Sequence, residues 1–249
     1  MSNPEFKTES FIGSGKFYLD GRRLGNCSEA KLSYSIDTKT LPNYEGGGGN
    51  LDSIDKITGV ALDLTCFNWS AQNIAMALAA TVGEEAAAAV TNEAHKMAKN
   101  TLVDTVFMID VSQAVVVKTK TGTPVTINQT DANGKPNYEV TPAGVVFLGG
   151  ADVVDDTAIT IDYKKAPHYL VQALLATGKE FKLIMDGMND ANGKPVTVRV
   201  WRFKPAPSDG MNLISDDFAS FTVKGQVLAD VSKAQGKSQF FEIAKAMAA

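Results

Sequence analysis

The sequence has 249 residues, of which 44% are hydrophobic and 21% are charged, and its formal net charge is −4 at pH 7. This length suffices for a sizeable core, and no apolar run approaches the roughly 18–20 residues of a membrane span, so we expect no membrane binding. The acidic balance argues against tight binding to phosphate backbones, which needs a basic surface. Two cysteines, Cys27 and Cys66, do not make a disulfide framework and are expected as thiols in a reducing cytoplasm.

The N-terminal residues Met1–Lys7 lack the basic start and the apolar stretch of a secretory signal, so we expect retention in the cytoplasm. Further along, Lys31–Thr38 and Val60–Cys66 alternate apolar with polar residues. A period of two is typical of strands that face water on one side. We expect these two strands to be neighbours.

The segment Leu41–Asp55 between the two strands is far longer than a hairpin turn needs. It contains four successive glycines, Gly46 to Gly49, with apolar residues on both sides of them. A glycine run loses much conformational entropy when it becomes ordered and buries nothing within its own subunit. Such a loop would order best against another surface, while a flexible hairpin tip is the alternative interpretation.

A helix is predicted next, over residues 71–81. Ser70 is a suitable N-cap because its hydroxyl can accept from a free amide of the first turn, and Gly83 is a suitable end. A buried stripe is expected at Ala71, Ile74 and Leu78. The alanine-rich stretch within 84–99 by itself also favours a helix.

From Val106 onward, short strand-like runs alternate with glycine and proline, which is typical of a small β sandwich or barrel. We interpret residues 106–165 as an inserted β subdomain on the outer surface, and residues 1–105 and 166–249 as the core of the protein. The runs are Ala114–Thr119, Val125–Ile127, Tyr138–Val140, Val145–Leu148 and Ala158–Tyr163.

After the insertion, Pro167 is well placed to begin a helix that Gly178 would end. Two long strands follow at Phe181–Gly187 and Val196–Phe203, and the strong turn signal Asn192-Gly193 lies between them. The last strands are expected within 218–231 and 239–244, and the C-terminal tail is compatible with a helix.

No combination of residues with catalytic or ligand-binding spacing is present. His95 and His168 lie far apart, without an acid or thiol at a zinc-ligand spacing, and the calcium-loop-like Asp131–Gly134 lacks the first and last ligands of that motif. The neighbouring carboxylates Asp155-Asp156 and Asp216-Asp217 would point to opposite faces of a strand. We therefore predict no enzyme activity, no catalytic residues, no cofactor and no metal.

The sequence Leu-Pro-Asn-Tyr-Glu-Gly-Gly-Gly-Gly-Asn at 41–50, followed by Ile57–Phe67 and the helix from Ser70, resembles the tail tube (major tail) proteins of long-tailed bacteriophages. The run Ile214–Ala219 resembles them as well, and the likeness extends from about Phe11 to Phe241. It implies a mainly β protein with helices (α+β), a β sandwich or barrel of two roughly orthogonal sheets with a flanking helix. Because this family usually runs extended over 84–99, we predict an irregular connection there.

The resemblance also implies an assembly function. Subunits of that family form rings, usually hexameric, that stack into a hollow tube conducting DNA from capsid to host, and the long loop between two early strands reaches the next ring. The stacking residues here would be Leu41, Pro42, Asn43, Tyr44, Glu45, Gly46, Gly47, Gly48, Gly49, Asn50 and Leu51. The tube wall would contain 30–40, 57–67, 181–187 and 196–203, and the polar phase that would face the lumen is Ser33, Ser35, Asp37, Asp63 and Thr65.

The partners implied are further copies of the chain, the tape-measure, tail-tip and tail-terminator proteins, and DNA that passes transiently and without specificity. The location implied is the virion, after assembly in the host cytoplasm. The alternative function is a carbohydrate- or receptor-binding β-sandwich module of a virion or adhesin. The inserted subdomain and its aromatic residues Tyr138, Phe147 and Tyr163 are compatible with that alternative.

Overall fold

The computed structural model describes residues 10–120 and 122–247, so the expectation for Met1–Lys7 concerns residues outside the described ranges. Strands make up 53% of the chain and helix only 3%, which confirms the predicted β-rich class. The chain divides into two compact units. We call the unit formed by the chain up to Val82 and from Val171 onward the main unit, and Gly83–Leu170 the inserted unit.

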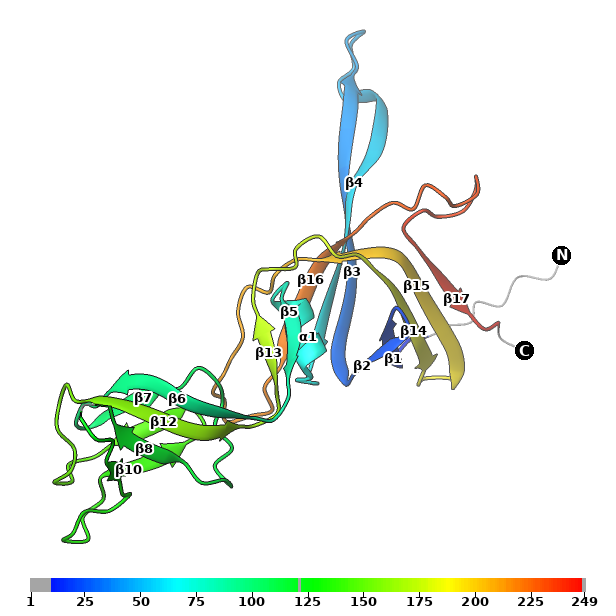
Figure 1. The fold of residues 1–249 in the computed structure, drawn as a ribbon. Helices are drawn as coiled ribbons and strands as arrows, with labels where there is room; N and C mark the ends of the chain where they lie inside the picture. Colours follow the sequence, from blue (N-terminus) through cyan, green and yellow to red (C-terminus); the bar gives the residue numbers. More distant parts are fainter. Residues whose placement is uncertain (1–9, 121, 248–249) are drawn as a thin grey trace. The chain divides into compact units, whose positions relative to one another are not determined.

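The main unit contains one eight-stranded antiparallel sheet, ordered β2-β1-β14-β15-β16-β4-β3, with β17 also paired to β15 (Figure 1). The turn predicted at Asn192-Gly193 joins β14 to β15. The strands are β1 (Gly13–Leu19), β2 (Arg22–Gly25), β3 (Cys27–Pro42), β4 (Asn50–Cys66), β14 (Phe181–Asn189), β15 (Lys194–Pro205), β16 (Phe221–Val227) and β17 (Phe241–Lys245).

The sheet changes partners along β15. Residues Val196–Val200 pair with β14 and β17, whereas Phe203–Pro205 pair with β16. An irregularity in the β14–β15 register separates these two parts, as expected where a strand bends. Hydrogen bonding therefore continues through β15, so the main unit has one continuous sheet where two sheets were predicted.

The core of the main unit is one hydrophobic cluster, with residues from strands at both ends of the bent sheet. Leu19 and Leu24 from β1 and β2 share it with Leu62 and Leu64 from β4 and with Phe203 at the bend. Alternate residues of β4 from Val60 to Cys66 are buried, which is the predicted period of two. The bent sheet thus encloses the hydrophobic core of this unit between its two ends.

The predicted helix is present but shorter, since α1 spans Ala71–Ala77. Ser70 is its N-cap, and its side chain accepts from the amide of Asn73 at 3.3 Å. The helix ends early because Ala79 adopts a positive φ of 47° and the Ala80 amide bonds back to the Ala75 carbonyl. The stripe predicted at Ala71, Ile74 and Leu78 is therefore wrong: these residues are half-buried, and the buried positions of the helix are Asn73, Ala75, Met76 and Ala77.

Asn73 is a fully buried polar residue that ties the helix to β2. Its amide nitrogen donates to the carbonyls of Leu24 and Asn68, at 2.7 and 2.9 Å, and its amide oxygen accepts from Arg22. We expect Asn73→Ala to lower the free energy of unfolding of the main unit by about 1–3 kcal/mol, because buried acceptors lose their donor. Urea unfolding followed by tryptophan fluorescence measures this loss, and an unchanged midpoint would contradict it.

The inserted unit packs a three-stranded sheet, β10-β11-β7, against a four-stranded sheet, β6-β12-β8-β9. Fully buried residues from both sheets, among them Val117, Phe147 and Ile161, form its core, which is separate from that of the main unit. The strands are β6 (Ala88–Lys96), β7 (Thr101–Asp104), β8 (Val116–Thr119), β9 (Thr126–Ile127), β10 (Tyr138–Thr141), β11 (Gly144–Phe147) and β12 (Ala158–Lys165).

The inserted unit begins earlier than the predicted 106–165, because β6 and β7 belong to its two sheets. The irregular connection predicted over 84–99 is likewise wrong. The two chain passages at its ends, β5 (Thr81–Glu85) and β13 (His168–Gln172), pair with each other.

The helix prediction after the insertion is also wrong. The helix expected from Pro167 is the strand β13, whose Tyr169 and Leu170 are exposed, so its apolar residues have no packing surface that would favour a helix. The strand predicted within 239–244 is confirmed as β17, which pairs with β15, and the described residues after it, 246–247, are not helical.

Candidate functional site

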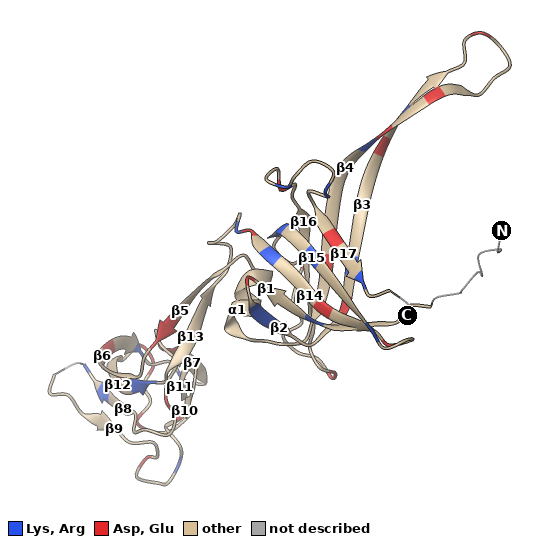
Figure 2. Cartoon of the chain, turned by 90° about the vertical axis from the view of Figure 1, so that its right-hand side faces the viewer, with Lys and Arg blue, Asp and Glu red and all other residues tan. Residues whose placement is uncertain are grey.

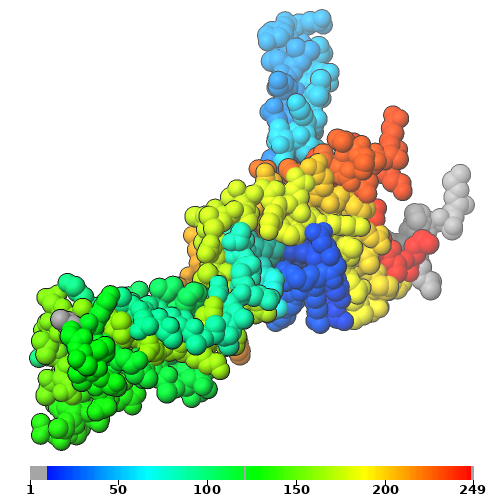
Figure 3. All heavy atoms as spheres, viewed as in Figure 1, coloured from blue at the N-terminus to red at the C-terminus, as the bar shows by residue number. Residues whose placement is uncertain are grey.

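The strands β3 and β4 continue together well beyond the main core. We call residues 34–59 the arm: every residue in it is exposed except the half-buried Asn43. Figures 1 and 3 show the arm projecting from the rest of the main unit. The ladder continues to the pair Pro42–Asn50, so the segment Leu41–Asp55, predicted as a long loop, is mostly strand and leaves only 43–49 as the turn.

Asn43 organises the tip of the arm. Its backbone amide donates to the Gly49 carbonyl at 3.0 Å. Its side chain donates to the Gly46 carbonyl and accepts from the Glu45 amide. All four glycines, Gly46 to Gly49, have positive φ between 73° and 103°, a conformation that disfavours other residues. The glycine run is thus required by the shape of the turn.

The arm carries seven exposed large hydrophobic residues. One row continues the core face of the sheet outward, since Tyr34 lies opposite the buried Val60 and the pair Ile36–Ile57 follows it. A register shift at Thr58 of β4 keeps this row on one face. The seven are Tyr34, Ile36, Leu41, Tyr44, Leu51, Ile54 and Ile57, and Tyr44 at the tip is 83% exposed.

The residues predicted to face a lumen share one face of the β3–β4 ladder. On β3 these are Ser33, Ser35 and Asp37, and on β4 they are Asp63 and Thr65, which pair with β3 residues of the same alternation. None of them is buried. The five side chains that were predicted from the alternation of polar and apolar residues therefore do lie on the same face of the two strands.

That face is not purely acidic or hydroxylic. Asp63 lies between Lys31 on β3 and Lys224 on β16, and Lys39 and Lys56 follow on the arm. Figure 2 shows basic and acidic residues interspersed over the strands of the main unit. The surface thus carries lysines next to the serine, threonine and aspartate side chains that were predicted to face a lumen.

Ser33 and Ser35 also line a groove of about 380 Å³ at the base of the arm. Its other wall comes from residues 226–229, at the end of β16. Beside this groove, β3 pairs with β4 only, so within the described ranges its second edge is free along its whole length. A long free edge is a template for pairing with another chain.

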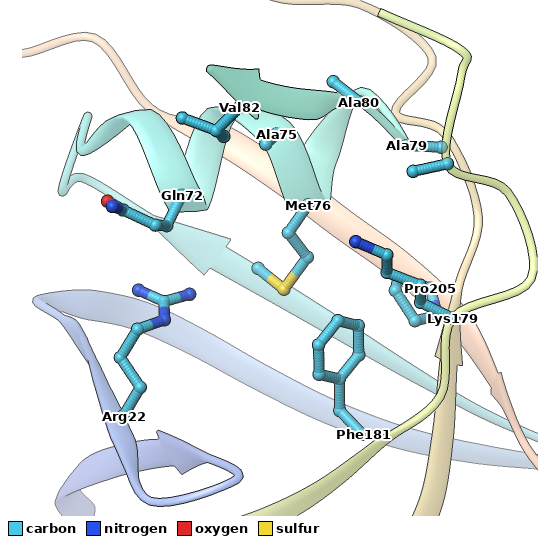
Figure 4. Close-up of a pocket in the computed structure, with 11 residues that line it drawn as sticks. Arg22, Gln72, Ala75, Met76, Ala79, Ala80, Val82, Lys179, Phe181 and Pro205 are labelled. Carbon is cyan, nitrogen blue, oxygen red and sulfur yellow. The ribbon is translucent and has the colours of Figure 1, made fainter. Parts of the chain in front are cut away.

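A second hollow lies beside α1 and was not predicted. Met76 of the helix and Phe181 of β14 form part of its apolar wall, and Arg22 and Lys179 bring two positive charges to it (Figure 4). The cavity measures about 340 Å³. No local pattern could have revealed it, because its lining comes from separate segments of the sequence.

The inserted unit contains a partly buried polar network around Glu93. The two carboxylate oxygens of Glu93 contact His95 Nε2 at 2.7 Å and accept from the Tyr163 hydroxyl at 2.6 Å, and the Val106 amide donates to the same carboxylate. Burial and the Glu93 contact raise the pKa of Tyr163 to about 12. The hydroxyl therefore stays protonated and holds β6 to β12.

Several carboxyl groups of the inserted unit have lowered pKa values, among them those of Glu93, Asp131 and Asp162. For Glu93, burial acts to raise the pKa, but the hydrogen bonds from Tyr163, Val106 and His95 outweigh it. Backbone amides, first that of Lys135, lower the pKa of Asp131. The Asn92 amide and then Lys118 lower that of Asp162.

These directions predict acid sensitivity of the inserted unit. A carboxyl group with a lowered pKa stabilises the fold above its ordinary pKa, here 3.8 for Asp and 4.5 for Glu, and this stabilisation is lost as the pH falls further. We expect the Tm of the inserted unit to be constant from about pH 7 to 5 and to fall below about pH 4. Calorimetry across this range measures it, and Glu93→Gln should reduce the slope; a Tm that rises on acidification would contradict the prediction.

The aromatic residues that would support a glycan-binding function are not on the surface. Tyr138, Phe147 and Tyr163 are all buried in the core of the inserted unit. They cannot stack against a sugar ring in this fold. No group of three or more His, Cys, Asp or Glu side chains is placed to hold a metal ion within residues 10–120 and 122–247.

Residues 10–244 match the family described as protein of unknown function UCP028589. The chain belongs to this family. No curated protein matches the chain significantly. In the described part of this family member, no helix has the length and apolar character to cross a membrane.

Proposed function

We propose that the protein is the structural subunit of a phage tail tube, which self-assembles into rings that stack into a hollow tube conducting DNA. The observation that carries the proposal is the arm, with seven large hydrophobic side chains on a projection that has no packing partner within its own described chain. Exposed apolar surface of this kind is typical of protein interfaces. A hairpin that projects from its sheet suits a contact with the next ring.

The free strand edges support a ring. Among the described residues, the outer edge of β3 has no pairing strand, and β2 ends the sheet on the other side. Pairing of edges between neighbouring copies would close the sheets into a continuous barrel and leave no edge free. The two ends of the bent sheet would then take the place of the two roughly orthogonal sheets of a tail tube subunit.

The mixed charges of the face that carries Ser33 and Asp63 suit a lumen surface. Three of its lysines lie opposite an aspartate on the adjoining strand: Lys31 and Lys224 opposite Asp63, and Lys56 opposite Asp37. A wall that is not strongly basic would release DNA readily, because tight binding needs many uncompensated cations. The proposed partners are other copies, the tape-measure, tail-tip and tail-terminator proteins, and passing DNA; the proposed location is the virion, after assembly in the host cytoplasm.

Negative-stain electron microscopy of the purified chain over a range of concentrations tests the proposal. We expect hollow tubes or six-fold rings, and ammonium sulfate should promote them because it strengthens apolar association. Particles of one chain at every concentration, with and without sulfate, would contradict the proposal. The alternative is a carbohydrate- or receptor-binding module. The aromatic residues that would support it are buried in the core of the inserted unit, and no other observation favours it.

A further inference from the structure

The cavity beside α1 combines an apolar wall with two positive charges. Met76 reaches into it between the Arg22 guanidinium and the Lys179 amine (Figure 4). Arg22 donates one hydrogen bond to Asn73. Neither Arg22 nor Lys179 takes part in the ion pairs among the described residues. The site therefore fits a ligand with apolar groups next to negative charge.

The segment 212–219, between β15 and β16, has that composition. Ile214 and Phe218 are 95% and 92% exposed, and Leu213 is almost as exposed. The acidic residues Asp216 and Asp217 lie between them. Large apolar side chains so fully in water indicate a surface that is covered in another state of the protein.

We propose that segment 213–218 of one copy binds in the α1 cavity of a second copy. Ile214 and Phe218 would cover the apolar wall, and the two aspartates would approach Arg22 and Lys179. An apolar cavity of about 150 Å³ already holds a benzene molecule, so a cavity of about 340 Å³ accommodates a phenyl ring with an aliphatic neighbour. The charges of segment and cavity are opposite, which favours this pairing over others.

The two surfaces are different parts of the molecule, so the contact is head-to-tail. Contacts of this type generate rings where the rotation closes. The inference deepens the proposed function, on which it rests for the association of copies. It assigns the contact between neighbours within a ring, separate from the arm.

A labelled peptide of residues 211–220 tests the contact on the full chain at concentrations where light scattering reports monomer. Fluorescence anisotropy should show saturable binding, and a scrambled peptide should not bind. We expect Lys179→Glu to weaken binding at least about tenfold, since it reverses a charge at the site. Lys237→Glu, the same charge change at an exposed position outside the cavity, should leave binding unchanged. Absent binding, or equal effects of the two substitutions, would overturn the inference.

Mixing distinguishes a second copy from binding within one chain. Lys179→Glu and Phe218→Asp chains should each associate more weakly than the native chain, and their equimolar mixture should form dimers, because one intact cavity then meets one intact segment. No dimers on mixing would overturn the inference. If rings form but the peptide does not bind, the tube proposal stands and the proposed contact is wrong. If the peptide binds but no rings form, the contact stands and the tube proposal is contradicted.

Discussion

Deletion of Gly46–Asn50 from the tip of the arm is expected to give a folded chain that forms no stacked tubes. None of the four glycines has an atom near the position of an added Cβ, so the tip makes no contact with the main core. Three residues would remain between Pro42 and Leu51, a common hairpin length. We therefore expect the free energy of unfolding to change by no more than about 0.5 kcal/mol.

Thermal unfolding and electron microscopy measure the two parts of this prediction. Long tubes of normal appearance from the deletion variant would contradict the assignment of the arm to stacking. A point variant with a matched control gives the same test without deletion. Tyr44→Ser on the arm should shorten or abolish tubes, whereas Tyr169→Ser, which removes an exposed aromatic side chain of β13, should not.

Replacing one fully buried phenylalanine should destabilise one unit and not the other. Phe147 and Phe203 are both fully buried, the first in the core of the inserted unit and the second in that of the main unit. Removing a buried phenyl group costs about 3–5 kcal/mol. For Phe147→Ala this lowers the Tm of the inserted unit by about 12 °C or more, since 1 kcal/mol corresponds to about 4–8 °C in a unit of this size.

Tryptophan fluorescence separates the two transitions, because the only tryptophans, Trp69 and Trp201, belong to the main unit. Phe147→Ala should leave the fluorescence transition in place while the calorimetric transition of the inserted unit moves. Phe203→Ala should have the opposite effect. Equal shifts of both transitions in both variants would show that the two units unfold together.

The sequence predicts best where one periodic pattern decides the structure. The alternation in Val60–Cys66 predicts a strand with one buried face, and the main unit buries those alternate residues. Ser70 likewise marks the helix start, and Asn192-Gly193 the turn between β14 and β15, because capping and positive φ are local requirements.

The failures occur where a distant partner decides the structure. The alanines near Ala88 have a local preference for helix, yet β6 pairs with β12 from Ala88 to Lys96. After Pro167 a strand forms because β5 is available as its partner. The α1 cavity could not be predicted for the same reason. Arg22 and Lys179 are far apart in the sequence, and only the folded chain brings both to the lining of one cavity.

The position of the inserted unit also has a consequence for the order of folding. Pairs of the main unit such as Gly13–Asn189 and Cys66–Phe221 join residues on the two sides of the insertion, whereas every strand of the inserted unit lies within one continuous segment. Contacts close in sequence form faster, because a shorter loop must be closed. We expect the inserted unit to collapse first during synthesis. Pairing of β5 with β13 then brings the two halves of the main unit to neighbouring positions. This lowers the entropy cost of closing the loop between them.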